Sequence, residues 1–158
     1  MKKLVAVTLC AALSVGMMTG CGKEEKKADD SVIKIGVLAP LTGTNAEYGK
    51  GFEIGTQMAA DRINAAGGVN GRKIEMVVKD SKGDSKESSD LCRMFADDEE
   101  IMAIIGDFTS GACMANAPIV DEAQIVQLSP TASNPDYAGM SDYCFSIMGR
   151  QDGEAPFY

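Results

Sequence analysis

The feature that most limits the possible folds of this chain is a regular alternation of short apolar stretches with longer stretches of helical periodicity. The short stretches predict β-strands at residues 33–39, 72–80, 101–105, 125–128 and 144–148. The longer stretches predict α-helices at residues 48–66, 85–98 and 112–123. Because each helix carries the chain back to the start of the next strand, the strands should run parallel. The sequence therefore predicts an α/β fold with an open, doubly wound, mostly parallel sheet and helices on both faces.

The predicted helices carry local signals for their ends and for their packing. We expect Ser85 or Asp84 to cap the second helix, and Pro118 to kink the third helix or end it early. The first helix should face the sheet through residues that recur at intervals of three and four: Phe52, Gly55, Ala59, Ile63 and Ala66.

The composition of the chain excludes several kinds of chemistry. The chain has 158 residues, enough for one domain, and none of them is histidine. A Ser-His-Asp triad, a Cys-His pair and a His-ligated metal are therefore excluded within this sequence. The five cysteines form no C-x-x-C pair, which gives little support to a zinc or redox site. We predict no catalytic residues, no metal and no cofactor.

The charge of the chain argues against a nucleic-acid partner. The net charge is −8, and removing Lys2 and Lys3 with a leader leaves 13 basic and 23 acidic residues, a net charge of −10. Nucleic-acid phosphates need a basic surface. We therefore predict that the chain does not bind nucleic acid.

The N-terminus has the order of regions found in a secretory signal. Two lysines precede the uncharged residues 4–18, a stretch shorter than the ~20 residues of a membrane-spanning helix. Residues 18–21 resemble the bacterial lipobox, in which the cysteine is acylated, although Met18 replaces the usual leucine. We predict a lipoprotein signal peptide at residues 1–20 and lipidation of Cys21. The alternatives are an uncleaved anchor or an ordinary signal peptide with an incidental cysteine.

A charged stretch separates this signal from the predicted fold. Residues 21–31 are rich in Lys, Glu and Asp and have no apolar period, which predicts a solvated tether. Residues 32–158 then form the predicted domain. A lipid on Cys21 would hold this domain outside the cytoplasmic membrane, in the periplasm or on the outer face of that membrane.

Small polar loops follow the predicted strands where such a sheet binds ligands. The apolar residues 101–105 break at Gly106, and Ser110 occupies the position expected of an N-cap for the next helix. The loops after the first, third and fourth strands should meet at one edge, which brings together Tyr48, Ser110 and residues 131–133. Hydroxyls, free N–H groups and an aromatic ring suit a small molecule with a carboxylate. The alternative is that Ser110 only caps its helix.

Four stretches resemble the leucine/isoleucine/valine-binding proteins, which are type I periplasmic binding proteins that deliver amino acids to ABC transporters: residues 35–43, 48–49, 63–71 and 128–135. The resemblance runs from about residue 32 to the end of the chain. It implies a non-enzymatic, extracytoplasmic protein that captures an amino acid, branched-chain or similar, for an ABC transporter permease. The predicted domain would be the N-terminal lobe of such a protein.

The family binds its ligand between two lobes, and the resemblance implies site residues in this one. Ser110 matches the serine whose hydroxyl and N–H hold the ligand α-carboxylate. Thr131, Ala132 and Ser133 match the second loop, which completes that carboxylate clamp. The remaining matches line the side-chain pocket: Tyr48, Phe108 and Thr109.

Members of this family are much longer than this chain and cross to a second lobe after a stretch like residues 150–152. We expect the chain to be an N-terminal fragment without the acidic residue and aromatics that the second lobe provides for the ligand ammonium. We also expect the 158-residue chain not to bind usefully alone, because water screens half-exposed ionic hydrogen bonds.

Other function classes fit part of this sequence. A sensor or receptor uses similar lobes as its ligand-binding domain and would need a spanning helix or signalling domain downstream. A binder of short amides or of other small carboxylates would share the same loops. An enzyme of flavodoxin-like fold is disfavoured, because the chain lacks histidine, carries an export signal and fails the phosphate-loop spacing at residues 43–50.

The cysteines of the predicted domain raise the question of a disulfide. Cys92 and Cys113 fall on consecutive helices that should share one face of the sheet, and the compartment permits oxidation. We therefore expect that they can form a disulfide, with Cys144 left over. The alternative is three buried free thiols.

Lipidation of Cys21 has a direct test. Mass spectrometry of the mature protein should find acyl chains on an N-terminal Cys21, because the basic, apolar and small-residue regions precede this cysteine in the order of a lipoprotein signal. A product that retains Met1 and carries no acyl chain would contradict the prediction.

Overall fold

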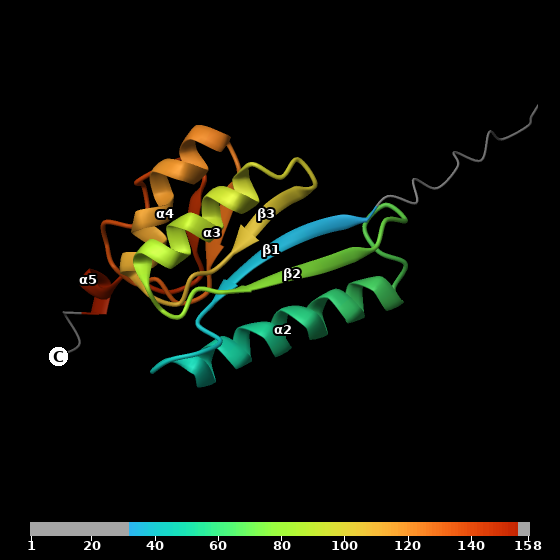
Figure 1. Ribbon diagram of the computed structural model, residues 1–158, viewed down its shortest axis with the longest axis horizontal. Helices are drawn as coiled ribbons and strands as arrows, with labels where there is room; N and C mark the ends of the chain where they lie inside the picture. Colours follow the sequence, from blue (N-terminus) through green and yellow to red (C-terminus); the bar gives the residue numbers. More distant parts are fainter. Residues whose placement is uncertain (1–31, 155–158) are drawn as a thin grey trace, which may run out of the picture.

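The structure is a computed structural model, and it describes residues 32–154 (Figure 1). Its elements in chain order are β1 Ile33–Ala39, α2 Ala46–Ala65, β2 Ile74–Asp80, α3 Ser85–Ala96, β3 Ile101–Ile105, α4 Ser110–Ala123, β4 Val126–Ser129, β5 Cys144–Ser146 and α5 Gln151–Glu154. The predicted signal peptide, Cys21 and the predicted tether lie outside the described residues. Within the described range, no helix has both the length and the apolar character needed to cross a bilayer.

The five strands form one parallel sheet in the order β2-β1-β3-β4-β5. Helices α3 and α4 cover one face, and α2 lies on the other face against β1 and β2 (Figure 1). The chain moves from β1 to β2 on one side and then to β3 on the other, so the topological switch point lies between β1 and β3. The predicted open, doubly wound parallel sheet is confirmed.

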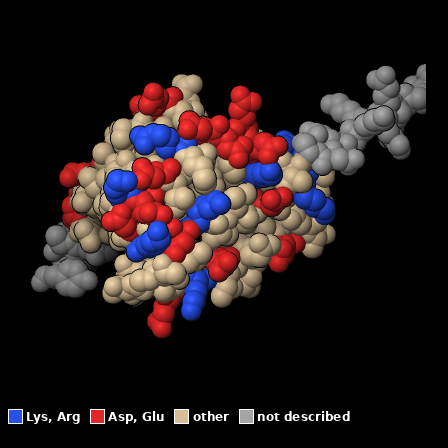
Figure 2. Space-filling view, in the orientation of Figure 1, with Lys and Arg blue, Asp and Glu red and all other residues tan. Residues whose placement is uncertain are grey.

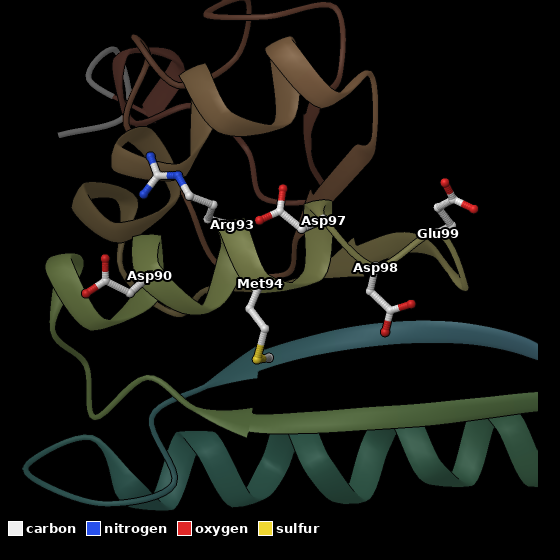
Figure 3. Close-up of a pocket in the computed structure, with 6 residues that line it drawn as sticks. All are labelled: Asp90, Arg93, Met94, Asp97, Asp98 and Glu99. Atoms are coloured by element: carbon white, nitrogen blue, oxygen red, sulfur yellow. The ribbon is translucent and has the colours of Figure 1, made fainter.

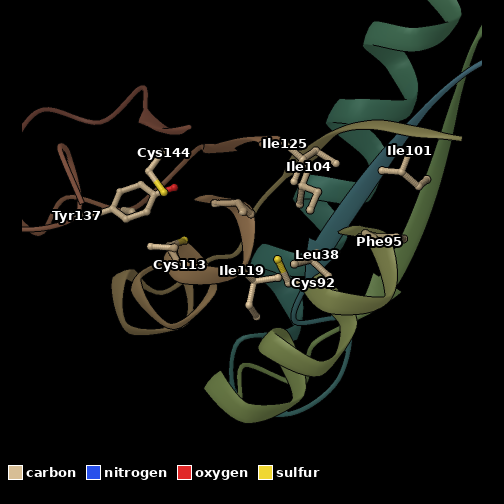
Figure 4. Packing of buried hydrophobic residues seen from close by; sticks show 13 residues of the cluster. Leu38, Cys92, Phe95, Ile101, Ile104, Cys113, Ile119, Ile125, Tyr137 and Cys144 are labelled. Atoms are coloured by element: carbon tan, nitrogen blue, oxygen red, sulfur yellow. The ribbon is translucent and has the colours of Figure 1, made fainter. Parts of the chain in front are cut away.

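The main core lies between the sheet and helices α3 and α4 (Figure 4). Leu38 of β1 and Ile104 of β3 are fully buried, and Phe95 of α3 is 2% exposed. Burial of side chains of this size contributes about 1.5–3 kcal/mol each. This packing fixes α3 and α4 on the sheet, and with them the turn that joins β3 to α4.

The opposite face of the sheet is covered only in part, because α2 packs on β1 and β2. On the uncovered side, Val126 of β4 and Phe145 of β5 are 39% and 49% exposed. Leu128 pairs with Ile105 on one side and with Phe145 on the other, so these apolar residues form one continuous surface. The prediction of helices on both faces is confirmed, and among the described residues the face that carries α2 is left uncovered at β4 and β5.

Helix α2 packs through a different face from the one that its periodicity predicts. Its buried residues are Gly49 and Ala60. Phe52 is half-buried, and the other four predicted positions are exposed: Gly55, Ala59, Ile63 and Ala66. The reason is a close backbone contact, since a Cβ at Gly49 would lie 2.1 Å from the carbonyl oxygen of Pro40. This contact sets the rotation of α2, and a count of apolar side chains cannot detect it.

Two helix ends refine the predictions. Of the two proposed caps for α3, Asp84 is the cap, because its carboxylate accepts the N–H of Glu87 at 2.8 Å. Helix α4 begins at Ser110 and runs through Pro118 to Ala123, so the prediction of an early end at Pro118 is wrong. Pro118 lies on the exposed side of α4, where water can replace the hydrogen bond that proline cannot donate.

The structure contradicts the predicted disulfide between Cys92 and Cys113. Both are free and buried, as is Cys144, which matches the alternative of three buried thiols. Burial raises the pKa of Cys92 to about 12 and that of Cys113 to about 11. Disulfide formation requires a thiolate, so this burial opposes the bond. The thiol of Cys113 instead donates to the carbonyl oxygen of Asp107 at 3.2 Å.

Two glycines of α2 provide a matched test of its packing. Gly49→Ala should lower the free energy of unfolding by about 1–3 kcal/mol, because the new methyl group would collide with the Pro40 backbone. Gly51→Ala meets no atom within 4 Å, so it should raise this free energy by about 0.5–1 kcal/mol through better helix propensity. Urea unfolding followed by circular dichroism measures both. A neutral Gly49→Ala would contradict the close contact.

Candidate ligand-binding site

Three loops meet at the carboxyl edge of the sheet, next to the switch point. They follow β1, β3 and β4 at residues 40–45, 106–109 and 130–135. Because β1, β3 and β4 are neighbours and run parallel, these loops leave the sheet side by side. The predicted convergence of the loops after the first, third and fourth strands follows from this topology.

The turn from β3 into α4 differs from the prediction in one residue. The N-cap of α4 is Thr109, whose hydroxyl accepts the N–H of Ala112 at 3.2 Å. The predicted capping role of Ser110 is therefore wrong, because Ser110 is the first residue of the helix itself. Its hydroxyl accepts the N–H of Asn134 from the third loop at 3.3 Å. Because Thr109 caps the helix and Asn134 uses one lone pair of the Ser110 hydroxyl, that hydroxyl keeps its proton and its second lone pair for another partner.

A buried serine joins the second and third loops. Ser129, at the end of β4, donates to the carbonyl oxygen of Asp107 at 3.1 Å and accepts the N–H of Ala132 at 2.9 Å. Thr131 donates its hydroxyl proton to the carbonyl oxygen of Phe108 at 2.6 Å. The Thr131 hydroxyl therefore makes a structural hydrogen bond. Ser133, two residues later, makes no side-chain hydrogen bond among the described residues. Sequence reasoning missed Ser129, although a hydroxyl that ends a strand beside a small polar loop was a usable signal.

Hydrogen-bond donors gather where these loops meet. The N–H groups of Ser110 and Gly111 begin α4 and have no acceptor within residues 32–154. The hydroxyl of Ser110 lies beside them, and its bond to Asn134 brings the adjacent Ser133 to the same place. The first N–H groups of a helix carry partial positive charge and point outward. This arrangement suits the oxygen atoms of a carboxylate.

An aromatic cluster lies beside these donors. The rings of Tyr48 and Phe108 stack with centroids 4.5 Å apart and planes 20° apart. Phe52 meets Phe108 edge-on at 6.3 Å, and it was not predicted as a site residue. Its position one helical turn after Tyr48 could have indicated it. Tyr48 remains 59% exposed, so the cluster presents a flat apolar surface to solvent.

A groove far from this edge does not form a comparable site. It lies near the C-terminal end of α3 and is lined by Asp90, Arg93, Met94, Asp97, Asp98 and Glu99 (Figure 3). Asp97 and Asp98 point away from each other in this view, and among the described residues no group of three carboxylate, thiol or imidazole side chains is placed to hold a metal. Basic side chains are interspersed with the acidic ones on the face shown in Figure 2. The groove is therefore a mixed, solvated surface.

Comparison with known proteins identifies the family to which the described fold is related. A family model described as periplasmic binding protein matches residues 32–156. An amino acid binding protein from Pseudomonas aeruginosa is 35% identical over 122 residues, which cover 76% of this chain and 32% of that protein. Leu/Ile/Val-binding protein homolog 1 from Brucella abortus is 34% identical over 121 residues, with 76% and 32% covered.

A solved structure has the same fold. The branched-chain amino acid transporter substrate binding protein LivJ from Streptococcus pneumoniae, in complex with isoleucine, aligns with a TM-score of 0.70 and 33% identity. The alignment covers 76% of this chain and 34% of that one. The chain thus spans about a third of the length of the relatives that it matches.

The assignment of the α4 cap can be tested by stability. Thr109→Ala should lower the free energy of unfolding by about 1 kcal/mol, because it removes the acceptor for the Ala112 N–H. Ser110→Ala should cost less than about 0.5 kcal/mol, since its hydroxyl does not cap the helix. Urea unfolding of the two variants measures the difference. The opposite order of costs would return the cap to Ser110.

Proposed function

Because this chain belongs to the periplasmic binding protein family, we propose that it forms the ligand-binding lobe of an extracytoplasmic protein that captures amino acids, branched-chain or similar, for an ABC transporter. The observation that carries the proposal is the set of donors at the start of α4, next to an exposed aromatic surface. The family is one of solute-binding proteins, and we propose that this member is likewise non-enzymatic.

In this proposal the α-carboxylate binds at the N-terminus of α4. The N–H groups of Ser110 and Gly111 and the hydroxyls of Ser110 and Ser133 donate to its two oxygen atoms. Hydrogen bonds to a charged group are stronger than neutral ones, and the partial charge of the helix end adds to them. Residues 131 and 132 contribute by shaping the loop that presents Ser133, since the Thr131 hydroxyl bonds to Phe108 and the N–H groups of both residues bond to the Ser129 hydroxyl.

The ligand side chain would lie against the stacked rings of Tyr48 and Phe108. An apolar side chain that covers these rings removes their exposed area from water, which favours leucine-like ligands over polar ones. Thr109 adds a small wall next to Phe108. The chemical basis for selecting an amino acid is therefore a carboxylate site and an apolar surface side by side.

The rest of the binding site would come from outside the described residues. An amino acid also carries an ammonium group. Within residues 106–110 and 129–135 the only acidic side chain is the buried Asp107, and the carboxylate of Asp80, at the end of β2, already accepts four hydrogen bonds from the protein. We propose that a second lobe provides a carboxylate for the ammonium and excludes water when it closes over the ligand. The proposed partners are a transporter permease and, through lipid on Cys21, the membrane.

The role of Ser110 has a direct binding test. In a protein that contains this lobe and its second lobe, Ser110→Ala should weaken leucine binding by about 1.5–3 kcal/mol, the range for a hydrogen bond to a charged group. Isothermal titration calorimetry measures the change. Ser141→Ala is the matched control, because the Ser141 hydroxyl bonds to Asp121 near the start of β5, at the opposite edge of the sheet. Unchanged binding by Ser110→Ala would contradict the proposed carboxylate site.

A further inference from the structure

Asp80 is the last residue of β2 and pairs with Ala39 at the carboxyl edge of the sheet. It stands beside the candidate site but belongs to none of the three loops that form it. Its carboxylate is nevertheless hydrogen-bonded to the first of them. The function described above gives this side chain no role.

The Asp80 carboxylate accepts four hydrogen bonds. One oxygen, Oδ1, accepts the N–H groups of Leu41 at 2.8 Å, Thr42 at 3.2 Å and Lys82 at 2.8 Å. The other, Oδ2, accepts the hydroxyl of Thr42 at 2.6 Å. Three of the four bonds come from the loop between β1 and α2, so this loop is tied to the end of β2.

These bonds matter because α2 has no cap of its own. The side chain of its N-cap residue, Asn45, makes no capping hydrogen bond. Helices α3 and α4, in contrast, are capped by Asp84 and Thr109. The start of α2 is instead held by the loop before it and by the contact of Gly49 with the Pro40 backbone. Any movement of residues 40–42 would therefore move the first turn of α2.

That first turn carries Tyr48, whose ring forms the exposed part of the aromatic cluster. The physical connection runs from Asp80 to the backbone of residues 41–42, then to Pro40, to Gly49 and to the adjacent Tyr48. Each step is a hydrogen bond, a covalent link or a contact too close for a methyl group. The chain of contacts is short.

We propose that Asp80 is a positioning residue of the ligand site, which holds the ring of Tyr48 against Phe108 by fixing the loop between β1 and α2. The relevance of Tyr48 to ligand binding rests on the proposed function. The structural link from Asp80 to Tyr48 can be tested without any ligand. Partial burial acts to raise the pKa of Asp80, but the hydrogen bonds that it accepts outweigh this effect and lower the pKa, so the carboxylate is ionised at neutral pH. An ionised carboxylate is the form that accepts all four bonds.

The first experiment measures amide hydrogen exchange of the whole chain by mass spectrometry. Asp80→Ala should speed exchange in peptides covering residues 41–49 by about tenfold or more. Local opening of this segment costs less free energy in the variant, because it no longer has to break the hydrogen bonds to Asp80. Asp84→Ala is the matched control, since it removes a similar acceptor from α3. It should speed exchange at residues 85–88 and leave residues 41–49 unchanged.

Two further variants keep this experiment decisive. Asp80→Asn should recover most of the protection, because its amide oxygen can accept the same backbone N–H groups. If Asp80→Ala fails to fold, Thr42→Val removes one of the four bonds and should give a smaller change in the same peptides. Protection at residues 41–49 that is equal in wild type, Asp80→Ala and Thr42→Val would overturn the proposal.

The second experiment reads the ring itself and then the ligand. In chain labelled with 3-fluorotyrosine, the Tyr48 resonance, assigned with Tyr48→Phe, should shift in Asp80→Ala and not in Asp84→Ala; an unmoved resonance would overturn the proposal.

In a protein with both lobes, Asp80→Ala should raise the dissociation constant for leucine about fivefold or more, as expected when an ordering interaction is lost. If the unchanged two-lobe protein does not bind leucine, the proposed function fails, while the exchange and fluorine results still decide the role of Asp80.

Discussion

The arrangement of the site depends on the close contact of two backbones where β3 leaves the sheet. A Cβ at Gly106 would lie 2.0 Å from the carbonyl oxygen of Leu38, and its φ of +113° lies in a region that side chains disfavour. Glycine therefore lets the chain turn against β1 without a gap. The same residue donates its N–H to the carbonyl oxygen of Leu128 at 2.9 Å, so the turn is also tied to β4. Gly106 therefore ties the turn before α4 to both neighbouring strands, β1 and β4.

Buried polar groups then fix the path of the turn. Gln127 donates its side-chain N–H to the carbonyl oxygen of Gly106 at 2.8 Å, and Ser129 and Cys113 both donate to the carbonyl oxygen of Asp107. A buried carbonyl without partners would cost free energy, so these donors make the irregular turn tolerable inside the protein. Because Ser129 also accepts N–H groups from the next loop, its hydroxyl links the two loops that carry the candidate carboxylate site.

The loops divide structural and proposed binding roles between neighbouring residues. In the second loop, the Thr109 hydroxyl caps α4 and the adjacent Ser110 hydroxyl faces the third loop. In the third loop, the Thr131 hydroxyl bonds to the fold and Ser133 makes no side-chain bond among the described residues. A threonine hydroxyl is held by its branched side chain, which suits a fixed structural bond, and Ser110 and Ser133 are left to present donors. The first loop follows the same logic if Asp80 holds it in place for Tyr48.

The sequence by itself determined the alternation of elements and the parallel sheet, because these follow from periodicity and from the geometry of parallel strands. It also led to the proposal of the carboxyl edge as the ligand site. It also predicted that Tyr48, Ser110 and Ser133 lie at or next to the loops of that edge. Only the tertiary structure decided that Thr109 is the cap, that Gly49 sets the rotation of α2 and that Cys92 and Cys113 stay as free thiols. Asp80 and Ser129 gained their roles in the same way. These features arise from contacts between residues far apart in the chain, where a hydrogen bond of about 3 Å or a missing methyl group decides the outcome, and a local pattern contains no such distances.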